Sequence, residues 1–315
     1  MLDIINRKFG KCVILSAGVL MVTLILLSCI TCKKNSDTPV TGKSPINLGG
    51  PEYSIASYNI RRTTTADADN RAWPIRRPLV VHLIKTYNFD VFGVQEPLGT
   101  QIDNLISDLP DYGRFGVSDH NDHAYQHQDI FYKKSRFTLL DSGKFWLAPG
   151  GPDFPPSDTT PWDNFYHTEV VTWGKFQDKA IGFQFYVFNA HFEPGAPVSQ
   201  VESARLILAK TASIAGTSPV IFMGDLNVDQ RSEAYSILKN SSTLKDTYST
   251  AVVRSPVIST FNNWKTDPGG DSRIDHIFTS SHFQVKIHNI LTDNYNKVLP
   301  SEHFPVLAGV IKKTP

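Results

Sequence analysis

Short apolar runs alternate with helix-like stretches from about residue 53 to the end of the chain. Strands are predicted where β-branched and aromatic residues cluster, and helices where apolar residues recur every three or four positions. The predicted strands are 53–60, 89–94, two within 129–146, a hairpin within 170–189 that turns near 178–179, and runs containing VIFMGD, RIDHIFTS and FPVLAGVI. The predicted helices are 76–87, 101–109, 199–215 and 233–239. Strands outnumber helices, which indicates mixed sheets covered by helices and not a repeat of strand and helix.

The first 51 residues have a different pattern. A basic start is followed by an apolar run over 13–27 and by Leu-Leu-Ser-Cys, which ends at Cys29. This order is typical of a secretory signal, and its last four residues resemble the bacterial lipobox, whose cysteine is lipidated. We expect a signal peptide over 1–28, lipidation at Cys29 and a flexible tether over 29–51. The alternative is a simple membrane anchor with an incidental cysteine, and Cys32 is a second candidate for the lipid.

These segments predict that residues 52–315 form one folded domain, held at a membrane of the bacterial cell envelope by its lipid anchor. The chain has 31 basic and 30 acidic residues and a net charge of +1, which argues mildly against a high-affinity nucleic-acid surface. All three cysteines precede residue 33, so the domain has no disulfide and no thiolate site. A metal would need oxygen and nitrogen ligands, which suit Mg²⁺ or Mn²⁺.

Polar residues able to do chemistry stand at the ends of the apolar runs. A single Asp or Asn after a strand is usually turn chemistry. Six such places occur here, and they hold Asn59, Glu96, Asn189 with His191, Asp225 with Asn227, Asp275 with His276, and Glu302 with His303. Because a sheet gathers strand ends at one edge, we expect these groups to meet in one crevice.

At these residues the sequence resembles the endonuclease/exonuclease/phosphatase superfamily. The resemblance is carried by SYNIR, VFGVQEP, FNAHFEP, MGDLNV, RIDHIF and SEHFPV, in the family's order, and it extends from Tyr53 to the C-terminus. It implies an α+β fold of the DNase I type, a four-layer α/β/β/α sandwich of two mixed β-sheets with helices on the outside.

Hydrolysis of a phosphate ester needs a cation, a base for water, and donors for the charge that grows on phosphorus. We expect the metal, Mg²⁺ or Mn²⁺, to be held by Asn59, Glu96 and Glu302, the last by resemblance alone. The expected catalytic residues are His191, Asp225, Asn227, Asp275 and His303. Asp225 would orient and deprotonate the water, Asn227 would hold a phosphate oxygen, and Asp275 would accept a hydrogen bond from His303.

Three positions depart from the family pattern. Glu302 and Glu193 stand where relatives usually have Asp. Glu169 lies in a stretch where secreted relatives tend to carry Arg, so a phosphate-binding cation is either missing or supplied by Arg61 or Arg62.

Other prominent residues are expected to have structural roles. His276 and the tryptophans Trp146, Trp162 and Trp173 should pack in the core or at its rim. The histidines of the segment 119–128 should lie in a solvated loop. This loop and 149–167 should set substrate specificity.

The sequence therefore predicts a metal-dependent phosphoesterase, with a phosphodiester as the leading substrate. A phosphomonoesterase or a lipid or sugar phosphatase is the alternative, and a non-catalytic protein that binds a phosphate ligand is the second. No obligate protein partner is expected.

Overall fold

The computed structural model describes residues 53–155, 162–163 and 168–313. The predicted signal peptide, the lipidation at Cys29 and the tether lie outside this range. Within it, no helix is long and apolar enough to cross a membrane.

The described chain forms two mixed β-sheets. The seven-stranded sheet has the order β10-β12-β13-β1-β2-β4-β3, with bounds β1 Tyr53–Asn59, β2 Val91–Gln95, β3 Tyr112–Ser118, β4 His127–Lys133, β10 Val253–Arg254, β12 Phe283–Ile290 and β13 Val306–Lys312. The six-stranded sheet has the order β5-β6-β7-β8-β11-β9, with bounds β5 Phe137–Trp146, β6 Val170–Asp178, β7 Gln184–His191, β8 Val220–Asp225, β9 Lys245–Asp246 and β11 Asp275–Thr279. Each sheet contains a parallel pair at its centre, β1 with β2 and β7 with β8, and β10 pairs parallel with β12 at the edge of the first sheet.

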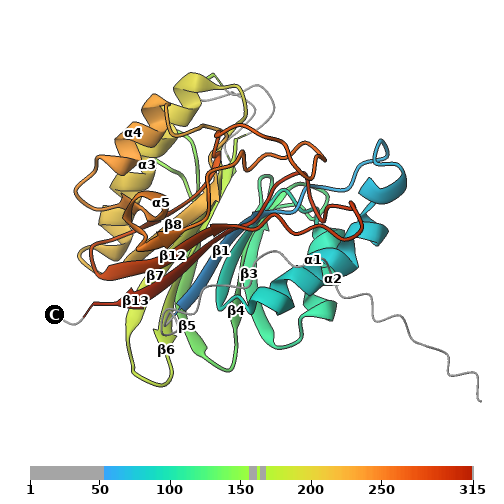
Figure 1. Cartoon of the computed structure of the whole chain (residues 1–315). Helices are drawn as coiled ribbons and strands as arrows, with labels where there is room; N and C mark the ends of the chain where they lie inside the picture. The colour runs from blue at the N-terminus through green and yellow to red at the C-terminus, as the bar shows by residue number, and fades with distance from the viewer. Residues whose placement is uncertain (1–52, 156–161, 164–167, 314–315) are drawn as a thin grey trace, which may run out of the picture. The chain divides into compact units, whose positions relative to one another are not determined.

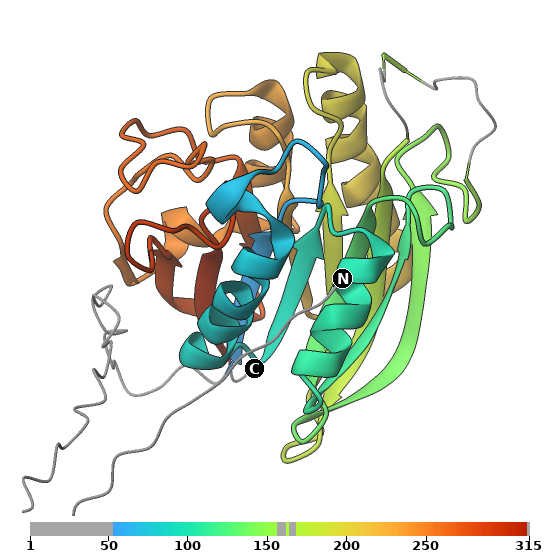
Figure 2. The ribbon, with the colours of Figure 1, turned by 90° about the vertical axis from the view of Figure 1, so that its right-hand side faces the viewer.

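Helices cover the outer faces of both sheets. Their bounds are η1 Asp69–Arg71, α1 Trp73–Tyr87, α2 Gly99–Asp108, α3 Pro197–Ala215, α4 Glu233–Lys239 and α5 Thr247–Thr250. Helices α3 and α4 lie on one side of the paired sheets and α1 and α2 on the other (Figure 1). Figure 2 looks onto the second side, where α1 and α2 lie in front of the strands. The predicted fold, two mixed sheets face to face with helices outside, is confirmed.

Side chains alternate along the central strands and divide the core into layers. In β1, Ile55 points between the two sheets and Ala56 points toward α1 and α2. In β8, Ile221 points between the sheets and Phe222 points toward α3 and α4. This two-residue period is the property of a strand that is buried on both faces. Packing on both faces holds the ends of these strands in fixed positions.

A buried amide joins the two sheets just beneath the strand ends. The side chain of Asn189, on β7, donates hydrogen bonds of 3.0 Å to the backbone oxygens of Val94 and Asp129, both on the opposite sheet. It accepts one of 2.6 Å from the side chain of Gln95. A Cβ at Gly93 would overlap the Asn189 amide, so glycine is needed there.

Several predicted boundaries were wrong. Helix α3 begins at Pro197, two residues before the predicted start, because Asp163 accepts hydrogen bonds from the backbone N–H groups of Val198 and Ser199 at 3.0 and 2.6 Å. The carboxylate of another segment thus accepts hydrogen bonds from the first turn of this helix. Helix α1 begins three residues earlier than predicted, at Trp73, with Pro74 in the first turn. Strands β3, β9, β10 and β12 were not predicted.

Candidate active site

The predicted site residues meet at one edge of the two sheets. Asn59 ends β1 and is in register with Gln95 of the parallel strand β2, so Glu96 follows beside it. His191 ends β7 opposite Asp225, the last residue of β8. Asp275 begins β11, which runs antiparallel to β8, and it also lies opposite Asp225. Six segments that are distant in sequence thus bring their polar ends together because of strand direction and register.

Glu96, Asp225 and His303 form the one group of three potential metal-ligating side chains found in the described part of the chain. Their ligand atoms lie within 4.8 Å of one another. The two carboxylates of this group suit a hard divalent cation that keeps part of its water shell. The amide NH₂ of Asn59 donates to Glu96 at 2.8 Å and to Asp225 at 2.9 Å, so Asn59 fixes both carboxylates. The residues present therefore fit a divalent metal.

His303 is held by acidic partners. Its Nδ1 lies 3.0 Å from Asp275 Oδ2 and 3.6 Å from Asp225 Oδ2. Burial lowers the pKa of His303, but Asp275 and Asp225 outweigh that effect and raise it to about 9. Burial and the nearby Asp275 charge raise the pKa of Asp225, to about 6. The hydrogen bond between Asp275 and His303 expected from the sequence is present, and it leaves His303 Nε2 as the other ring nitrogen for chemistry.

His191 has an acidic partner that the sequence did not reveal. Its Nδ1 lies 2.8 Å from Glu169 Oε1, and Glu169 also accepts a hydrogen bond of 3.1 Å from Gln128. The other ring nitrogen, Nε2, lies 2.9 Å from the Asn227 amide nitrogen and 3.7 Å from Asp225 Oδ2. Burial lowers the pKa of His191, but Glu169 and, to a smaller extent, Asp225 and Glu96 raise it to about 10. Glu169 was noted in the sequence only as a departure from the family.

Glu302 faces an arginine. Arg61 forms an ion pair with Glu302 and a second one of 2.8 Å with Asp67. The hydroxyl of Ser301 donates to the Asn59 backbone oxygen at 2.8 Å and so ties this loop to the end of β1. The metal-ligand roles assigned to Asn59 and Glu302 remain predictions.

Two site residues adopt left-handed backbone conformations. Glu96 has a φ of 71° and Asn227 a φ of 50°. Asn tolerates this region, whereas for Glu it costs on the order of 1–2 kcal/mol. Such strain is typical of functional positions, since the surrounding structure must impose it. At Glu96 the turn directs the carboxylate toward Asn59, whose side-chain amide donates to it at 2.8 Å.

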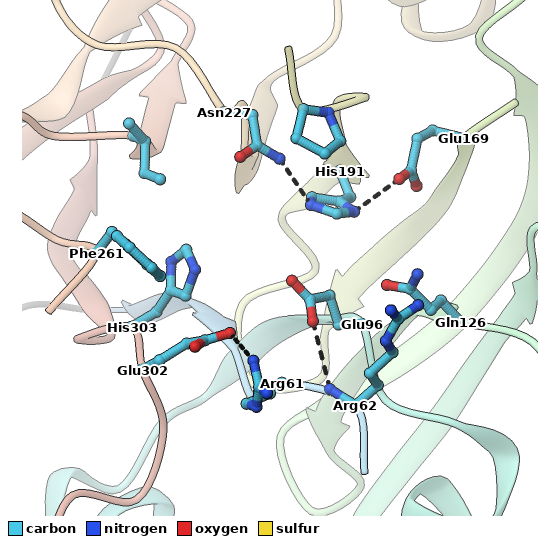
Figure 3. Close-up of a pocket in the computed structure, with 12 residues that line it drawn as sticks. Arg61, Arg62, Glu96, Gln126, Glu169, His191, Asn227, Phe261, Glu302 and His303 are labelled. Atoms are coloured by element: carbon cyan, nitrogen blue, oxygen red, sulfur yellow. Dashed lines mark hydrogen bonds and ion pairs between the residues drawn. The ribbon is translucent and has the colours of Figure 1, made fainter. Parts of the chain in front are cut away.

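These side chains surround a cavity of about 410 Å³. Glu96 lies in the middle of Figure 3, with His303, Glu302 and Phe261 to its left and Arg62 and Gln126 to its right. His191, Asn227 and Glu169 line its upper side in that view. A buried acidic and imidazole centre inside a cavity of this size can hold a phosphate group, a metal ion and water.

The residues expected to be structural lie outside this centre. His276 is buried, with its ring 5.0 Å from that of Tyr235 and Nε2 3.0 Å from the Val228 oxygen. Trp146 is also buried, while Trp162 and Trp173 pack at the edge of the core. His127 corrects the sequence analysis, because it is buried on β4 and not in a solvated loop. Its Nδ1 lies 3.3 Å from Asp129 Oδ2 on the same strand.

Known proteins that are similar in sequence and structure agree with this geometry. Residues 56–292 match the model of the Endonuclease/Exonuclease/phosphatase family. A mannosyl-6-phosphatase from Bacteroides thetaiotaomicron is 33% identical, with a TM-score of 0.78 over 82% of this chain and 99% of its own. A family member from Bacteroides vulgatus is also 33% identical, with a TM-score of 0.77 over 83% of this chain and 99% of its own.

A more distant relative is viral. An uncharacterized protein of Acanthamoeba polyphaga mimivirus is 26% identical over 208 residues, which cover 55% of this chain and 30% of that protein. This chain therefore corresponds to less than a third of that relative's length.

Proposed function

The chain belongs to the endonuclease/exonuclease/phosphatase family of phosphate-ester hydrolases, and within that family we propose that it hydrolyses a phosphomonoester of a small molecule, a sugar phosphate in the first place. A similar solved structure is a mannosyl-6-phosphatase. This proposal changes the order of the substrates expected from the sequence, where a phosphodiester came first.

The observation that carries the proposal is the charge around the cavity. Of the described residues that line it, Arg61 and Arg62 are the arginines, and the others include three glutamates, Glu96, Glu169 and Glu302. Arg61 is already paired with Glu302 and Asp67. A protein that binds a nucleic-acid strand neutralises several phosphates in a row with Lys and Arg. The described residues that line this cavity offer no such row, and they suit one phosphate with a small substituent.

Glu96 is the proposed principal metal ligand, with Asn59 and Glu302 as the further ligands predicted from the sequence. The bound Mg²⁺ or Mn²⁺ would supply positive charge that offsets the charge of the phosphate oxygens. Burial raises the pKa of Glu96, but the charges of His191 and His303 and the Asn59 hydrogen bond bring it below its usual range, so the carboxylate is ionised.

The other residues act on water and on the phosphate. Asp225 orients the attacking water and takes its proton while the water oxygen forms a bond to phosphorus. As the ester P–O bond breaks, His303 passes a proton from Nε2 to the leaving oxygen, with Asp275 holding the opposite ring nitrogen. Asn227 and His191 contact the remaining phosphate oxygens, and Glu169 sets the orientation of His191.

The test compares esters and metals on the soluble domain, residues 43–315. We would assay p-nitrophenyl phosphate, hexose 6-phosphates, bis-p-nitrophenyl phosphate and plasmid DNA with Mg²⁺, Mn²⁺ or EDTA. We expect hydrolysis of the monoesters with metal, its loss in EDTA, and its loss in Glu96→Ala and Asp225→Asn. A higher rate on the diesters would favour the phosphodiesterase alternative. Failure of a broad panel of esters would favour the phosphate-binding protein.

We also propose that the domain is held at the bacterial cell envelope by a lipid on Cys29, on the strength of the signal-like start of the chain. The full chain expressed in a Gram-negative host should partition with membranes, and Cys29→Ala should release it. Membrane association that persists equally in Cys29→Ala would contradict the lipid anchor.

A further inference from the structure

Two neighbouring arginines at the end of β1 have different surroundings. Arg61 has a φ of 55°, which ends the extended backbone of β1. Its side chain turns toward Glu302, whereas that of Arg62 lies on the other side of Glu96, with Gln126 (Figure 3). Arg61 forms ion pairs with Asp67 and Glu302. Its guanidinium is therefore already neutralised by the protein.

The backbone N–H of Arg62 makes a hydrogen bond, whereas its guanidinium has no partner among the described residues. Its backbone N–H donates to Glu96 Oε2 at 3.4 Å, which places the residue beside the carboxylate proposed to bind the metal. Its side chain lines the cavity and is exposed, and in the described part of the chain no carboxylate or carbonyl pairs with it. A guanidinium aimed into an acidic cavity without a protein partner is placed to bind oxygens of a ligand.

Gln126 adds a second uncommitted group on the same side. Its backbone forms a bridge with Leu98 and its carbonyl accepts from Asp119 at 3.0 Å, so its position is set by the backbone. Within the described range its side-chain amide makes no hydrogen bond, although it lines the cavity. It belongs to the segment 119–128, where substrate specificity was expected.

The opposite wall has a different chemistry. Phe261 is 40% exposed although it is a large apolar residue, and its ring centroid lies 5.1 Å from that of His303. A substrate whose phosphate lies between His191 and His303 would place its remaining part between an apolar ring on one side and Arg62 and Gln126 on the other.

We propose that Arg62, supported by Gln126, determines specificity by binding a second anionic group on the part of the substrate that carries the hydrolysed phosphate. The second group is a phosphate or a carboxylate, since both present oxygens that a guanidinium binds in a bidentate manner. The inference rests on the proposed phosphomonoesterase function and narrows its substrate class to sugar phosphates that bear a further negative charge.

The experiment uses pairs of substrates that differ only in that charge. Hexose 1,6-bisphosphate is compared with hexose 6-phosphate, and a hexuronic acid 1-phosphate with the matching hexose 1-phosphate. The proteins are the parent domain, Arg62→Gln, Arg62→Lys and Gln126→Ala, with Arg205→Gln as a control because Arg205 is an exposed arginine on α3, away from the cavity. p-Nitrophenyl phosphate serves as the substrate without a second polar group.

The parent should prefer one doubly charged substrate, and the pair that shows the preference tells phosphate from carboxylate. Arg62→Gln should reduce kcat/KM for that substrate by about tenfold or more, mainly through KM, because a hydrogen bond to a charged group is lost. p-Nitrophenyl phosphate should change less than about threefold, and Arg62→Lys should be intermediate because it keeps the charge without the bidentate geometry. An equal change on all substrates, or an unchanged preference, overturns the proposal.

A binding measurement separates this inference from the proposed function. Calorimetry on the Asp225→Asn protein, with and without Arg62→Gln, gives Kd for both compounds of the pair that shows the preference. This measurement needs no turnover. If no monoester is hydrolysed but the doubly charged compound binds tighter only when Arg62 is present, the proposed function fails and the Arg62 site stands. If monoesters are hydrolysed but Kd does not depend on Arg62, the site is refuted and the function stands.

Discussion

Replacing Glu169 by Gln tests whether this buried carboxylate acts on the reaction through His191. The two side chains are 2.8 Å apart, and their exposed fractions are 1% and 5%. Gln keeps the size and a polar oxygen but loses the charge. A hydrogen bond to a charged group contributes about 1.5–3 kcal/mol, which corresponds to a fall of roughly 10- to 150-fold in kcat/KM if it is felt in the transition state. Glu169→Ala should fall further, because it also removes the hydrogen bond that orients the ring.

The assay is hydrolysis of p-nitrophenyl phosphate with Mg²⁺, followed at several substrate concentrations. Glu202→Gln is the matched control, since Glu202 is a carboxylate on the surface of α3 that pairs with Arg205. The double variant Glu169→Gln with His191→Gln should be no slower than His191→Gln alone, because residues that act as one unit are not additive. A folded Glu169→Gln protein with kcat/KM within threefold of the parent would refute the reasoning, and so would additive losses.

Three further predictions concern the frame around the site. Gly224→Ala should lower the melting temperature by several degrees in a thermal scan, because a Cβ at residue 224 would overlap the Ala190 carbonyl of the neighbouring strand. Gly150→Ala, where a Cβ meets no atom and only the positive φ of 77° is unfavourable, should lower it less, and a parent-like melting temperature for Gly224→Ala would contradict this. Burial lowers the pKa of His288 to about 3, so the unfolded chain binds a proton below pH 6.5 that the folded protein does not, and stability should fall as pH falls from 6.5 toward 3. Between pH 7.5 and pH 5 the parent should lose about 2 kcal/mol more stability in urea unfolding than His288→Gln, and equal losses would count against it. Phe261→Ala should raise KM for hexose phosphates more than it raises Ki for inorganic phosphate, a competitive inhibitor. The reason is that we expect the exposed ring to contact the sugar and not the phosphate. Equal changes in KM and Ki would refute the contact.

Much of the site could be predicted from the sequence because neighbouring parallel strands end at the same edge of a sheet. Asn59 ends β1, and Glu96 directly follows the adjacent parallel strand β2. His191 and Asp225 end another parallel pair, so the proximity of these residues follows from the order of strands once the sheets are known. Strand β12 was missed although its burial alternates along most of FQVKIHNI, which is the period-two signal of a strand. Strand β3, Tyr112–Ser118, contains two glycines and is only partly buried, so its pattern is weak.

The partners of the site residues depend on register and could not be predicted in the same way. Glu169 reaches His191 because β6 pairs antiparallel with β7, with Val171 opposite Ala190, and a shift of one residue would turn the carboxylate away. Arg61 and Glu302 meet across 241 residues of sequence. Helix α3 shows the same limit, since its N-terminal hydrogen bonds go to Asp163, which lies 35 residues before Val198.

Two of the three departures from the family pattern, at Glu169 and Glu302, concern the distribution of charge around the phosphate. Glu169, in the stretch where an arginine was expected, places a carboxylate against His191 and so couples that imidazole to a negative partner. Glu302 engages Arg61, which removes this arginine from the set of free cations. Arg62 is then the arginine of the cavity whose charge remains available to a ligand in the described structure. A doubly charged substrate must approach three glutamates, so we expect its binding to depend on the metal and on Arg62 together. Removal of the metal by EDTA and removal of charge by Arg62→Gln should therefore each weaken the binding of a doubly charged sugar phosphate, whereas Arg62→Gln alone should spare p-nitrophenyl phosphate.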